Sequence, residues 1–541
     1  MWKATGKHYR ATHNPKLETE QMIHLKINNQ AIEVPEGTTL LEAARKLGIE
    51  IPTMCHLEDT EHFTSCMVCL VKDARNGRLV ASCSMPAMEG MEIITDDDEC
   101  RESRKMVLEL LLSEHVGDCE APCQSVCPAH MNIPLMNRLI AAGKHQEAID
   151  VVKRDIALPA ILGRICPAPC EAGCRRKPID EAVSICLLKG FVADHEIQKE
   201  ISLTADSGRK VAIVGAGPAG LAAAFYLNKA GHTVTLFEKK SEAGGALLEI
   251  EDSVLPEEVR KKEIDALLNS KIHVEYQTEI NSEGFIQLQQ EFDAVILATG
   301  VLKDSFEEWE LKLSKSGVEV DKKTYQTSLP KVFAIGNALR LSKLAVRSVG
   351  QGKELAFILN NWFESGKLSA LPERFNSKFG KLLEAEYDSY LKESNHKVRN
   401  FAGKGKAIGF TVEEAEAEAS RCLHCDCRNT ESCKLRNLAN EFGAEQKRFQ
   451  YDQRLLVQKE FAAGTVVFEP GKCIKCGICV RLTKQHQEEF GFSFIARGFD
   501  VRIGVPFSQS VEKALMKTAV LVATKCPTGA LALIDSEEQI D

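Results

Sequence analysis

The sequence contains 20 cysteines, and nearly all of them stand in groups whose close spacing is typical of metal ligands. Residues 1–20 are polar and lack the apolar core of a secretory signal. We therefore expect a reducing cytoplasm, where thiols bind metals rather than pair as disulfides. Cys127 and Cys526 are each followed by proline, which is typical of iron–sulfur proteins. These patterns favour iron–sulfur clusters over zinc, and hence electron transfer.

A second pattern suits a nucleotide. The apolar run 211–214 leads into Gly215-x-Gly217-x-x-Gly220 and then into an Ala/Leu-rich helical segment. This is the strand–turn–helix context of a dinucleotide fingerprint, in which the glycines allow a tight turn, a close pyrophosphate and close helix–strand packing. Glu238 ends the next apolar strand, where a carboxylate can accept hydrogen bonds from a ribose. A Gly-rich turn in an α/β protein is the alternative.

The elements that carry these residues must belong to several domains, because 541 residues exceed one core and predict three to five domains. The net charge of −9 and the pI near 6.0, with no basic aromatic patch, give no reason to expect nucleic acid. No run approaches the ~18 consecutive apolar residues of a membrane span, so none is predicted. Alternating strand and helix patterns predict a multidomain α/β and α+β fold.

Residues 20–100 contain Cys55, Cys66, Cys69 and Cys83 after two β-rich runs and a short helical pattern. The strings IPTMC, SCMVCLV and ASCSMPAMEGM resemble the [2Fe–2S] domain of the large iron–sulfur subunit of respiratory complex I and of its hydrogenase relatives. Plant-type ferredoxins have a shorter first spacing and a longer last one. The resemblance implies a β-grasp [2Fe–2S] ferredoxin-like domain with these four ligands. A zinc knuckle is the alternative.

Residues 101–203 carry further cysteines in helical, turn-rich sequence. CPAHMNIP and GRICPAPCEAGCRR resemble the helical iron–sulfur domain of the glutamate synthase small subunit and of dihydropyrimidine dehydrogenase, which interleaves the ligands of two [4Fe–4S] clusters. The resemblance implies one cluster on His115, Cys119, Cys123 and Cys174, and another on Cys127, Cys166, Cys170 and Cys186. His115 stands where the family has a cysteine, and imidazole can replace thiolate on iron. A surface or helix-capping histidine is the alternative, and Cys100 is interpreted as a free thiol.

Residues 204–364 resemble the Rossmann-like flavin-binding domain of the same family. Gly244–Gly245 resemble the pair that approaches the flavin, FDAVILATG resembles the buried strand and turn, and LPKVFAIGNA resembles the terminal flavin-binding strand. The resemblance implies FAD, with contacts from Gly215, Gly217, Pro218, Ala219, Gly220, Glu238, Lys239, Gly244, Gly245, Ala298, Thr299, Gly300, Gly336 and Asn337. The family usually has Asp at the position of Asn337, so a hydrogen bond from the ribityl chain would lack charge assistance.

The NAD(P)H domain of that family is missing. Members that use NADPH insert it between the ATG strand and the final flavin strand. Here only 35 residues separate Gly300 from Gly336. A βαβ unit alone needs about 30 residues, so a complete nucleotide domain does not fit. Electrons must then reach the flavin through clusters or through another subunit.

Residues 365–440 predict a solvated helical connector that ends in Cys422, Cys425, Cys427 and Cys433, a [4Fe–4S] pattern with structural zinc as the alternative. Residues 441–541 contain a triplet and a distant Pro-linked cysteine, namely Cys473, Cys476, Cys479 and Cys526. In two-cluster ferredoxins such a set shares one cluster. We therefore predict a ferredoxin-like [4Fe–4S] domain. Its second cluster is lost, because Thr483 stands in place of that cluster's Pro-linked ligand.

These sets amount to one [2Fe–2S] and four [4Fe–4S] clusters beside one FAD. We interpret the chain as an iron–sulfur flavoprotein electron-transfer subunit of an NAD(P)- or ferredoxin-linked oxidoreductase complex, with electron bifurcation as a candidate activity. The implied partners are a complex I-like NADH/FMN flavoprotein subunit and a ferredoxin or catalytic subunit. Two alternatives stay open: a self-contained NAD(P)H:acceptor oxidoreductase, and a flavin-free cluster wire or scaffold. No acid–base pair or nucleophile stands out, so no catalytic residue is predicted.

Overall fold

The computed structural model describes residues 21–534 apart from 61–62, 198–203, 269–271, 302, 403–406, 452 and 463. The chain forms two compact units. The first unit takes in the described parts of Met1–His115, Ser432–Arg454 and Phe461–Ala532. The second takes in those of Val116–Glu431, Leu455–Glu460 and Leu533–Asp541. Each unit therefore combines segments that are far apart in the sequence.

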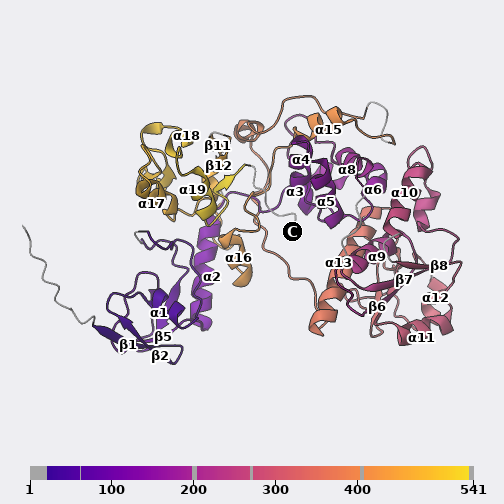
Figure 1. Ribbon diagram of the computed structural model, residues 1–541, viewed down its shortest axis with the longest axis horizontal. Coiled ribbons are helices and arrows are strands. Elements are labelled where there is room, and N and C mark those ends of the chain that lie inside the picture. Colours follow the sequence, from indigo (N-terminus) through magenta and orange to yellow (C-terminus); the bar gives the residue numbers. More distant parts are fainter. Residues whose placement is uncertain are drawn as a thin grey trace, which may run out of the picture. The chain divides into compact units, whose positions relative to one another are not determined.

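The N-terminal part of the first unit is a five-stranded sheet in the order β2-β1-β5-β3-β4 (Figure 1). Its elements are β1 (Met22–Ile27), β2 (Gln30–Pro35), α1 (Leu40–Lys46), β3 (Leu70–Asp73), β4 (Arg78–Ala81) and β5 (Glu92–Ile94). Strand β1 alternates exposed and buried residues, which gives the sheet one core-facing side. Asn28 and Asn29 join β1 to β2, and both have the positive φ that a tight hairpin turn requires.

The rest of the first unit consists of the helices α2 (Asp98–Ser113) and α16 (Lys434–Glu441) and of the C-terminal segment. The helices of that segment are α17 (Ile478–Gln485), α18 (Val511–Ala514) and α19 (Ala519–Lys525). Two small sheets accompany them, one formed by β11 (Glu460–Ala462), β12 (Val466–Phe468) and β15 (Leu531–Leu533), the other by β13 (Ser493–Ile495) and β14 (Arg502–Gly504). Helix α16 packs against α2. Arg448, which follows α16, forms an ion pair with Glu109, a buried residue of α2. The chain therefore returns to its own N-terminal region within this unit.

The second unit begins with a helical segment. Its helices are α3 (Pro122–Ser125), α4 (Ile133–Ala141), α5 (His145–Asp155), α6 (Pro159–Ile165), α7 (Pro169–Ala172) and α8 (Ile185–Asp194), and later in the chain α14 (Tyr387–Leu391) and α15 (Val412–Ala419). Gly163 on α6 faces Gly190 on α8 so closely that a Cβ on Gly163 would lie 2.5 Å from the Gly190 Cα. This contact brings the end of α6 and the beginning of α8 together.

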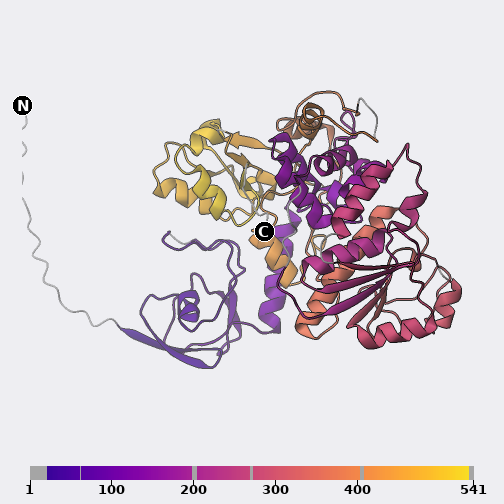
Figure 2. The ribbon, with the colours of Figure 1, turned by 45° about the vertical axis from the view of Figure 1, so that its right-hand side comes forward.

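The remainder of the second unit is a parallel sheet in the order β10-β9-β6-β7-β8 (Figure 2). Its elements are β6 (Lys210–Val214), α9 (Pro218–Lys229), β7 (Thr233–Glu238), α10 (Glu257–Leu268), β8 (His273–Tyr276), α11 (Ser282–Glu291), β9 (Ala294–Leu297), α12 (Lys303–Glu308), β10 (Val332–Ala334) and α13 (Ala345–Ser365). Alternate residues of β6 enter different cores: Val211 and Ile213 pack with residues of α9 and α13, whereas Ala212 and Val214 pack with residues of α11. Both faces of the sheet are therefore covered, as a parallel sheet requires.

The segment between β9 and β10 is short. Its described residues contain α12 and the isolated bridge Leu313–Val318, and they add no strand to any sheet of the described chain. The parallel sheet therefore continues from β9 to β10 with no further sheet inserted among those described residues.

Candidate metal centres and flavin site

The first thiol group lies beside the β3–β4 hairpin of the first unit. Cys69 directly precedes β3 and Cys83 follows β4, and their sulfurs are 3.1 Å apart. Cys55 interacts with both Cys66 and Cys83, and all four side chains are buried. The thiol contact with Cys66 lowers the pKa of Cys55, and the same contact raises the pKa of Cys66. Since these four thiols resist ionising together, a bound cationic centre would stabilise them as thiolates.

The C-terminal segment of the first unit contacts the loop that carries this group. Arg481 on α17 donates a hydrogen bond from Nη2 to the Cys55 carbonyl oxygen at 2.7 Å. Phe494 meets Phe63 edge-on, with ring centroids 5.6 Å apart. Close by, Cys473, Cys476, Cys479 and Cys526 line a small common cavity. Two four-cysteine groups thus lie in one compact unit, as neighbouring electron carriers would.

A third group, in the second unit, consists of Cys127, Cys166, Cys170 and Cys186. The close contact of α6 and α8 places Cys166, at the end of α6, against Cys186, near the start of α8. The buried ammonium Nζ of Lys189 lies 3.9 Å from the Cys186 sulfur. Burial alone would lower the pKa of Lys189, but the negative charge of the surrounding thiolates outweighs burial and raises it. The negative charge of this cysteine group therefore stabilises the Lys189 ammonium. Lys189 lies one helical turn after Cys186, and this spacing is a signal that the sequence analysis missed.

Replacing Lys189 with methionine is expected to make a cluster on this group harder to reduce, because the positive charge stabilises the added electron. A unit charge about 7 Å away at an effective dielectric constant of about 20 is worth about 2 kcal/mol, or roughly 100 mV. Redox titration followed by EPR should show one cluster signal whose midpoint falls by that order. Lys189→Arg retains the charge and serves as the control. An unchanged midpoint in Lys189→Met would contradict the assignment.

The fourth group departs from the grouping that the sequence implies. Cys123 and Cys174 share an enclosed cavity with Cys422 and Cys425, from a segment far along the chain. The sequence grouping instead combines the first two with Cys119 and His115, and the last two with Cys427 and Cys433. Among the described residues, no three His, Cys, Asp or Glu side chains converge on a single metal ion. The thiolates of a [4Fe–4S] cluster bind four different irons, so they are spaced more widely than the ligands of one ion.

The remaining predicted ligands are distributed over both units. His115 and Cys433 belong to the first unit, whereas Cys119 and Cys427 belong to the second. The Cys427 N–H donates to the Cys119 carbonyl oxygen at 3.1 Å, so these two cysteines are neighbours. Burial lowers the pKa of His115 to about 4, and its Nδ1 has no hydrogen-bond partner among the described residues. Its imidazole is therefore neutral at pH 7, which is the form that binds metal.

Cys100 lies outside every group. Its buried side chain on α2 contacts the Ile94 carbonyl oxygen at 3.8 Å, and burial raises the pKa of the thiol to about 11. It is therefore protonated at neutral pH, as a structural free thiol would be.

The glycine loop between β6 and α9 has the geometry of a pyrophosphate cradle. A Cβ on Gly220 would lie 2.0 Å from the Gly215 carbonyl oxygen, so Gly220 is needed for packing. A Cβ on Gly217 would meet only the Gly245 Cα, at 3.9 Å, so Gly217 faces open space beside the helix N-terminus. Gly245 belongs to the turn η1 (Gly245–Glu249), which approaches this loop. The loop thus fits a dinucleotide, with Gly217 and Gly245 as its inner surface.

Two polar residues predicted to contact FAD, Glu238 and Asn337, already accept hydrogen bonds from the main chain. One oxygen of buried Glu238 accepts the Ala216 N–H at 2.8 Å and the other accepts the Lys240 N–H at 2.9 Å. The Asn337 Oδ1 accepts the Ser342 N–H at 2.9 Å. These bonds hold the loops in place. Each oxygen has a further lone pair, so both residues could still accept a hydrogen bond from a hydroxyl group of a bound flavin nucleotide.

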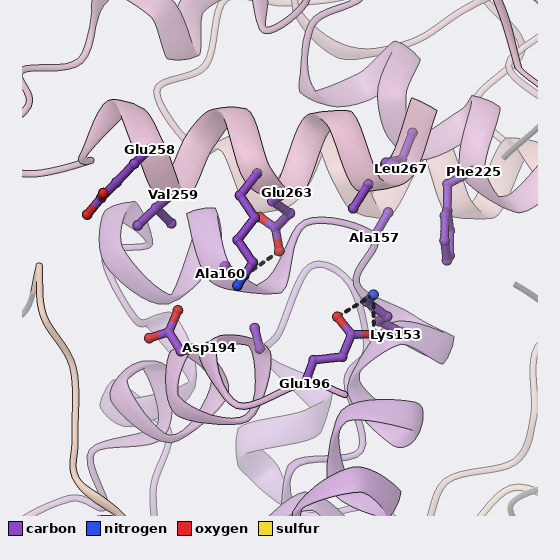
Figure 3. Close-up of a pocket in the computed structure, with 13 residues that line it drawn as sticks. Lys153, Ala157, Ala160, Asp194, Glu196, Phe225, Glu258, Val259, Glu263 and Leu267 are labelled. Atoms are coloured by element: carbon purple, nitrogen blue, oxygen red, sulfur yellow. Dashed lines mark hydrogen bonds and ion pairs between the residues drawn. The ribbon is translucent and has the colours of Figure 1, made fainter. Parts of the chain in front are cut away.

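A separate cavity of about 330 Å³ lies where α5, α6 and α8 meet α9 and α10 (Figure 3). The Glu263 carboxylate, on α10, accepts the N–H groups of Ala160 and Ile161 at 2.6 and 2.8 Å. Burial raises the pKa of this carboxyl to about 7. Lys153 forms an ion pair with Glu196 across the same cavity. Glu263 thus joins the helical segment to α10, and no cysteine or glycine lines the cavity among the described residues.

Glu393 anchors the segment that follows Cys422 and Cys425. Its buried carboxylate forms ion pairs with Arg428 and Lys459, and Lys459 also donates to the His424 carbonyl oxygen at 3.3 Å. Burial would raise the pKa of Glu393, but Lys459 and Arg428 outweigh burial and lower it to about 2. Since the folded pKa lies below the unfolded value of 4.5, this carboxylate stabilises the fold above about pH 4.5. That contribution is lost as the pH falls toward 2.

The Glu393→Gln variant is therefore expected to have a lower free energy of unfolding than the wild type at pH 6. On acidification, its free energy of unfolding should fall by less than that of the wild type. A shift of one pKa unit corresponds to about 1.4 kcal/mol. The stability gap between the wild type and this variant should narrow by roughly 1–2 kcal/mol between pH 6 and pH 3. Urea unfolding followed by far-UV circular dichroism measures the gap. A gap that stays constant over this range would contradict the role of the carboxylate.

Three family models match the chain. They are a 2Fe-2S iron–sulfur cluster binding domain at residues 20–98, dihydropyrimidine dehydrogenase domain II with a 4Fe-4S cluster at residues 113–201, and pyridine nucleotide-disulphide oxidoreductase at residues 189–352. The described chain has no helix that is long and apolar enough to cross a membrane.

Curated relatives match parts of the chain. The beta subunit of NADP(+)-dependent formate dehydrogenase from Moorella thermoacetica is 36% identical over 208 residues, 34% of this chain and 29% of that protein. The glutamate synthase [NADPH] small chain of Bacillus subtilis is 37% identical over 210 residues, 34% of this chain and 41% of that protein. Subunit PreT of the NAD-dependent dihydropyrimidine dehydrogenase of Salmonella typhimurium is 33% identical over 189 residues, 34% of this chain and 46% of that protein. This chain spans less than half the length of each.

A solved NAD+-reducing [NiFe]-hydrogenase chain is 31% identical, covers 22% of this chain and 49% of its own, and has a TM-score of 0.17. The matched domains and the curated relatives define the class of this protein. Over about a third of its length the chain is similar to the glutamate synthase small chain and to the dihydropyrimidine dehydrogenase subunit, which is the resemblance that the sequence predicts. It is a multidomain α/β protein with a 2Fe-2S domain, a 4Fe-4S domain and a Rossmann-like oxidoreductase domain.

Proposed function

We propose that the chain is an electron-transfer subunit of an NAD(P)- or ferredoxin-linked oxidoreductase complex, with FAD in the glycine loop and iron–sulfur clusters on the cysteine groups. The observation that carries this proposal is the position of α13. A Cβ on Gly352 would lie 2.6 Å from the Ala219 carbonyl oxygen in the first turn of α9, and one on Gly350 would lie 2.4 Å from the Pro128 carbonyl oxygen beside Cys127. One helix therefore touches both the flavin loop and a cysteine group, which supports electron transfer between them.

In this proposal the residues of the chain bind and insulate the carriers. The glycine loop and the N-terminus of α9 would hold the FAD pyrophosphate, and the cysteine groups would hold one [2Fe–2S] and four [4Fe–4S] clusters. FAD supplies the conversion between one- and two-electron steps when it is bound. The N-terminal part of the first unit would be a β-grasp domain and its C-terminal part a ferredoxin-like domain. The thiol content suits the reducing cytoplasm.

The proposed partners follow from the short segment between β9 and β10. Because no second nucleotide-binding sheet lies among the described residues between β9 and β10, another subunit must bind the hydride donor. A complex I-like NADH/FMN flavoprotein subunit would contact the 2Fe-2S domain, and a ferredoxin or catalytic subunit would take the other end of the chain of carriers. Electron bifurcation at the flavin is a further candidate activity of such a complex.

Anaerobic purification of the chain, alone and with its native partners, tests this function. We expect one FAD and about 18 irons per chain, given the cluster types above. NADH or NADPH should not bleach the flavin of the isolated chain, but should do so once the partner subunits are added. Rapid bleaching of the isolated chain would favour a self-contained NAD(P)H oxidoreductase. A chain that holds iron but no FAD would favour a cluster wire or scaffold.

A further inference from the structure

We propose that Cys123, Cys174, Cys422 and Cys425 together ligate one [4Fe–4S] cluster, in place of the two sets in which the sequence divides them. The inference rests on the proposed iron–sulfur content, but not on the flavin or the partners. The four side chains line one small cavity of the second unit, where Cys123 and Cys422 are buried and Cys174 and Cys425 are half-buried. Four thiols around one enclosed space match the ligand number and type of this cluster.

Three short segments deliver these cysteines. Cys123 lies on α3, Cys174 follows α7, and Cys422 and Cys425 follow α15. A Cβ on Gly173 would lie 2.8 Å from a methyl group of Val126, so α3 and α7 approach each other closely. The first two thiols are thereby carried by neighbouring elements of the helical segment itself.

Two arginines fix the segment that carries the distant pair, Cys422 and Cys425. Arg421, next to Cys422, donates to the Glu418 carboxylate at 2.8 Å and to the Asp180 carboxylate at 3.1 Å. Asp426, next to Cys425, accepts two N–H groups of Arg138 on α4 at 3.0 Å. The segment that holds the two cysteines is therefore clamped at both ends to the helices around Cys123 and Cys174.

Polar groups also reach the cavity in the way that cluster sites require. The buried amide of Asn137 lines it and interacts with Cys422, and its Oδ1 has no hydrogen-bond partner among the described residues. Arg175, next to Cys174, also lines it. Amide and guanidinium N–H groups beside thiolate sulfurs offset the negative charge of a cluster and its ligands.

Paired substitutions test the ligand set. If both substituted cysteines bind the same cluster, the chain loses the irons of that cluster alone. If they bind different clusters, the chain loses the irons of both. In the anaerobically purified full chain, Cys123→Ala with Cys422→Ala should lose about four irons. Cys422→Ala with Cys427→Ala should lose about eight. Iron and acid-labile sulfide per chain are measured, with FAD content as the check on folding. Cys100→Ala is the control and should lose none.

A loss of about eight irons from the Cys123/Cys422 pair overturns the inference, and this is the loss that the sequence grouping requires. If the alanine pairs do not fold, single serine variants replace them, since serine can still bind iron but changes the EPR signal of its own cluster. Cys123→Ser and Cys422→Ser should then alter the same signal, and Cys427→Ser a different one. Three separate signals would overturn the inference. A wild-type chain that holds zinc or no iron would instead refute the proposed function.

Discussion

Replacement of Gly217 by alanine is expected to abolish flavin binding while the fold stays intact. The φ of Gly217 is −80°, which alanine adopts without strain, and the new Cβ would meet only the Gly245 Cα at 3.9 Å. The added methyl group would occupy the space through which the loop backbone approaches a pyrophosphate. We expect bound FAD to fall at least ~10-fold, which corresponds to about 1.4 kcal/mol. The ratio of flavin absorbance to protein measures it.

The matched control is Gly220→Ala, three residues further on. There the Cβ would lie 2.0 Å from the Gly215 carbonyl oxygen, so the helix and the strand would have to separate. Overpacking of this kind costs about 1–3 kcal/mol, and we expect this variant to lose both flavin and thermal stability. Gly217→Ala should retain the thermal midpoint and the iron content of the wild type. Full FAD occupancy in Gly217→Ala would rule out this loop as the flavin site.

Arg421→Ala is expected to have the largest effect on stability. Arg421 is 1% exposed and its partner Glu418 is 0% exposed, so the substitution leaves a carboxylate buried without its cation. Removing one partner of a buried ion pair costs about 3–5 kcal/mol. The guanidinium also donates to the carbonyl oxygens of Ala182 and Glu181, which join α15 to the helical segment. Urea unfolding of the second unit should therefore begin at clearly lower denaturant.

The same substitution should release the segment that carries Cys422 and Cys425, with loss of about four irons per chain. Arg374→Ala is the control, because Arg374 pairs with Glu431 at the surface, where both side chains are about half exposed. Exposed pairs of this kind contribute about 0–1 kcal/mol, so the control should keep its iron and its stability. Equal stability losses in the two variants would contradict the structural role of Arg421.

Local patterns were sufficient for the glycine loop and for the cysteine triplet of the C-terminal segment. The run 210–221 predicts a strand, a glycine turn and a helix, and the structure has β6 and α9 there. The spacing of Cys473, Cys476 and Cys479 predicts a common site, and these residues do line one cavity. Such elements follow from hydrophobic periodicity and turn chemistry, which act over a few residues. The resemblance to iron–sulfur flavoproteins also followed from the motifs and their order.

The partners of Cys123 and Cys174 were decided by the tertiary structure alone. Adjacent spacing suggested that Cys422 and Cys425 belong with Cys427 and Cys433, because sequence proximity is the only guide that a single sequence offers. Arg421 and Arg138 override that guide, since the ion pairs Arg421–Asp180 and Arg138–Asp426 fix the segment against parts of the chain far upstream. The sequence by itself thus determined which residues bind metal or nucleotide in our proposal. Only the packing of distant segments decided which cysteines face one another, because long-range ion pairs and helix contacts leave no periodic signal in the sequence.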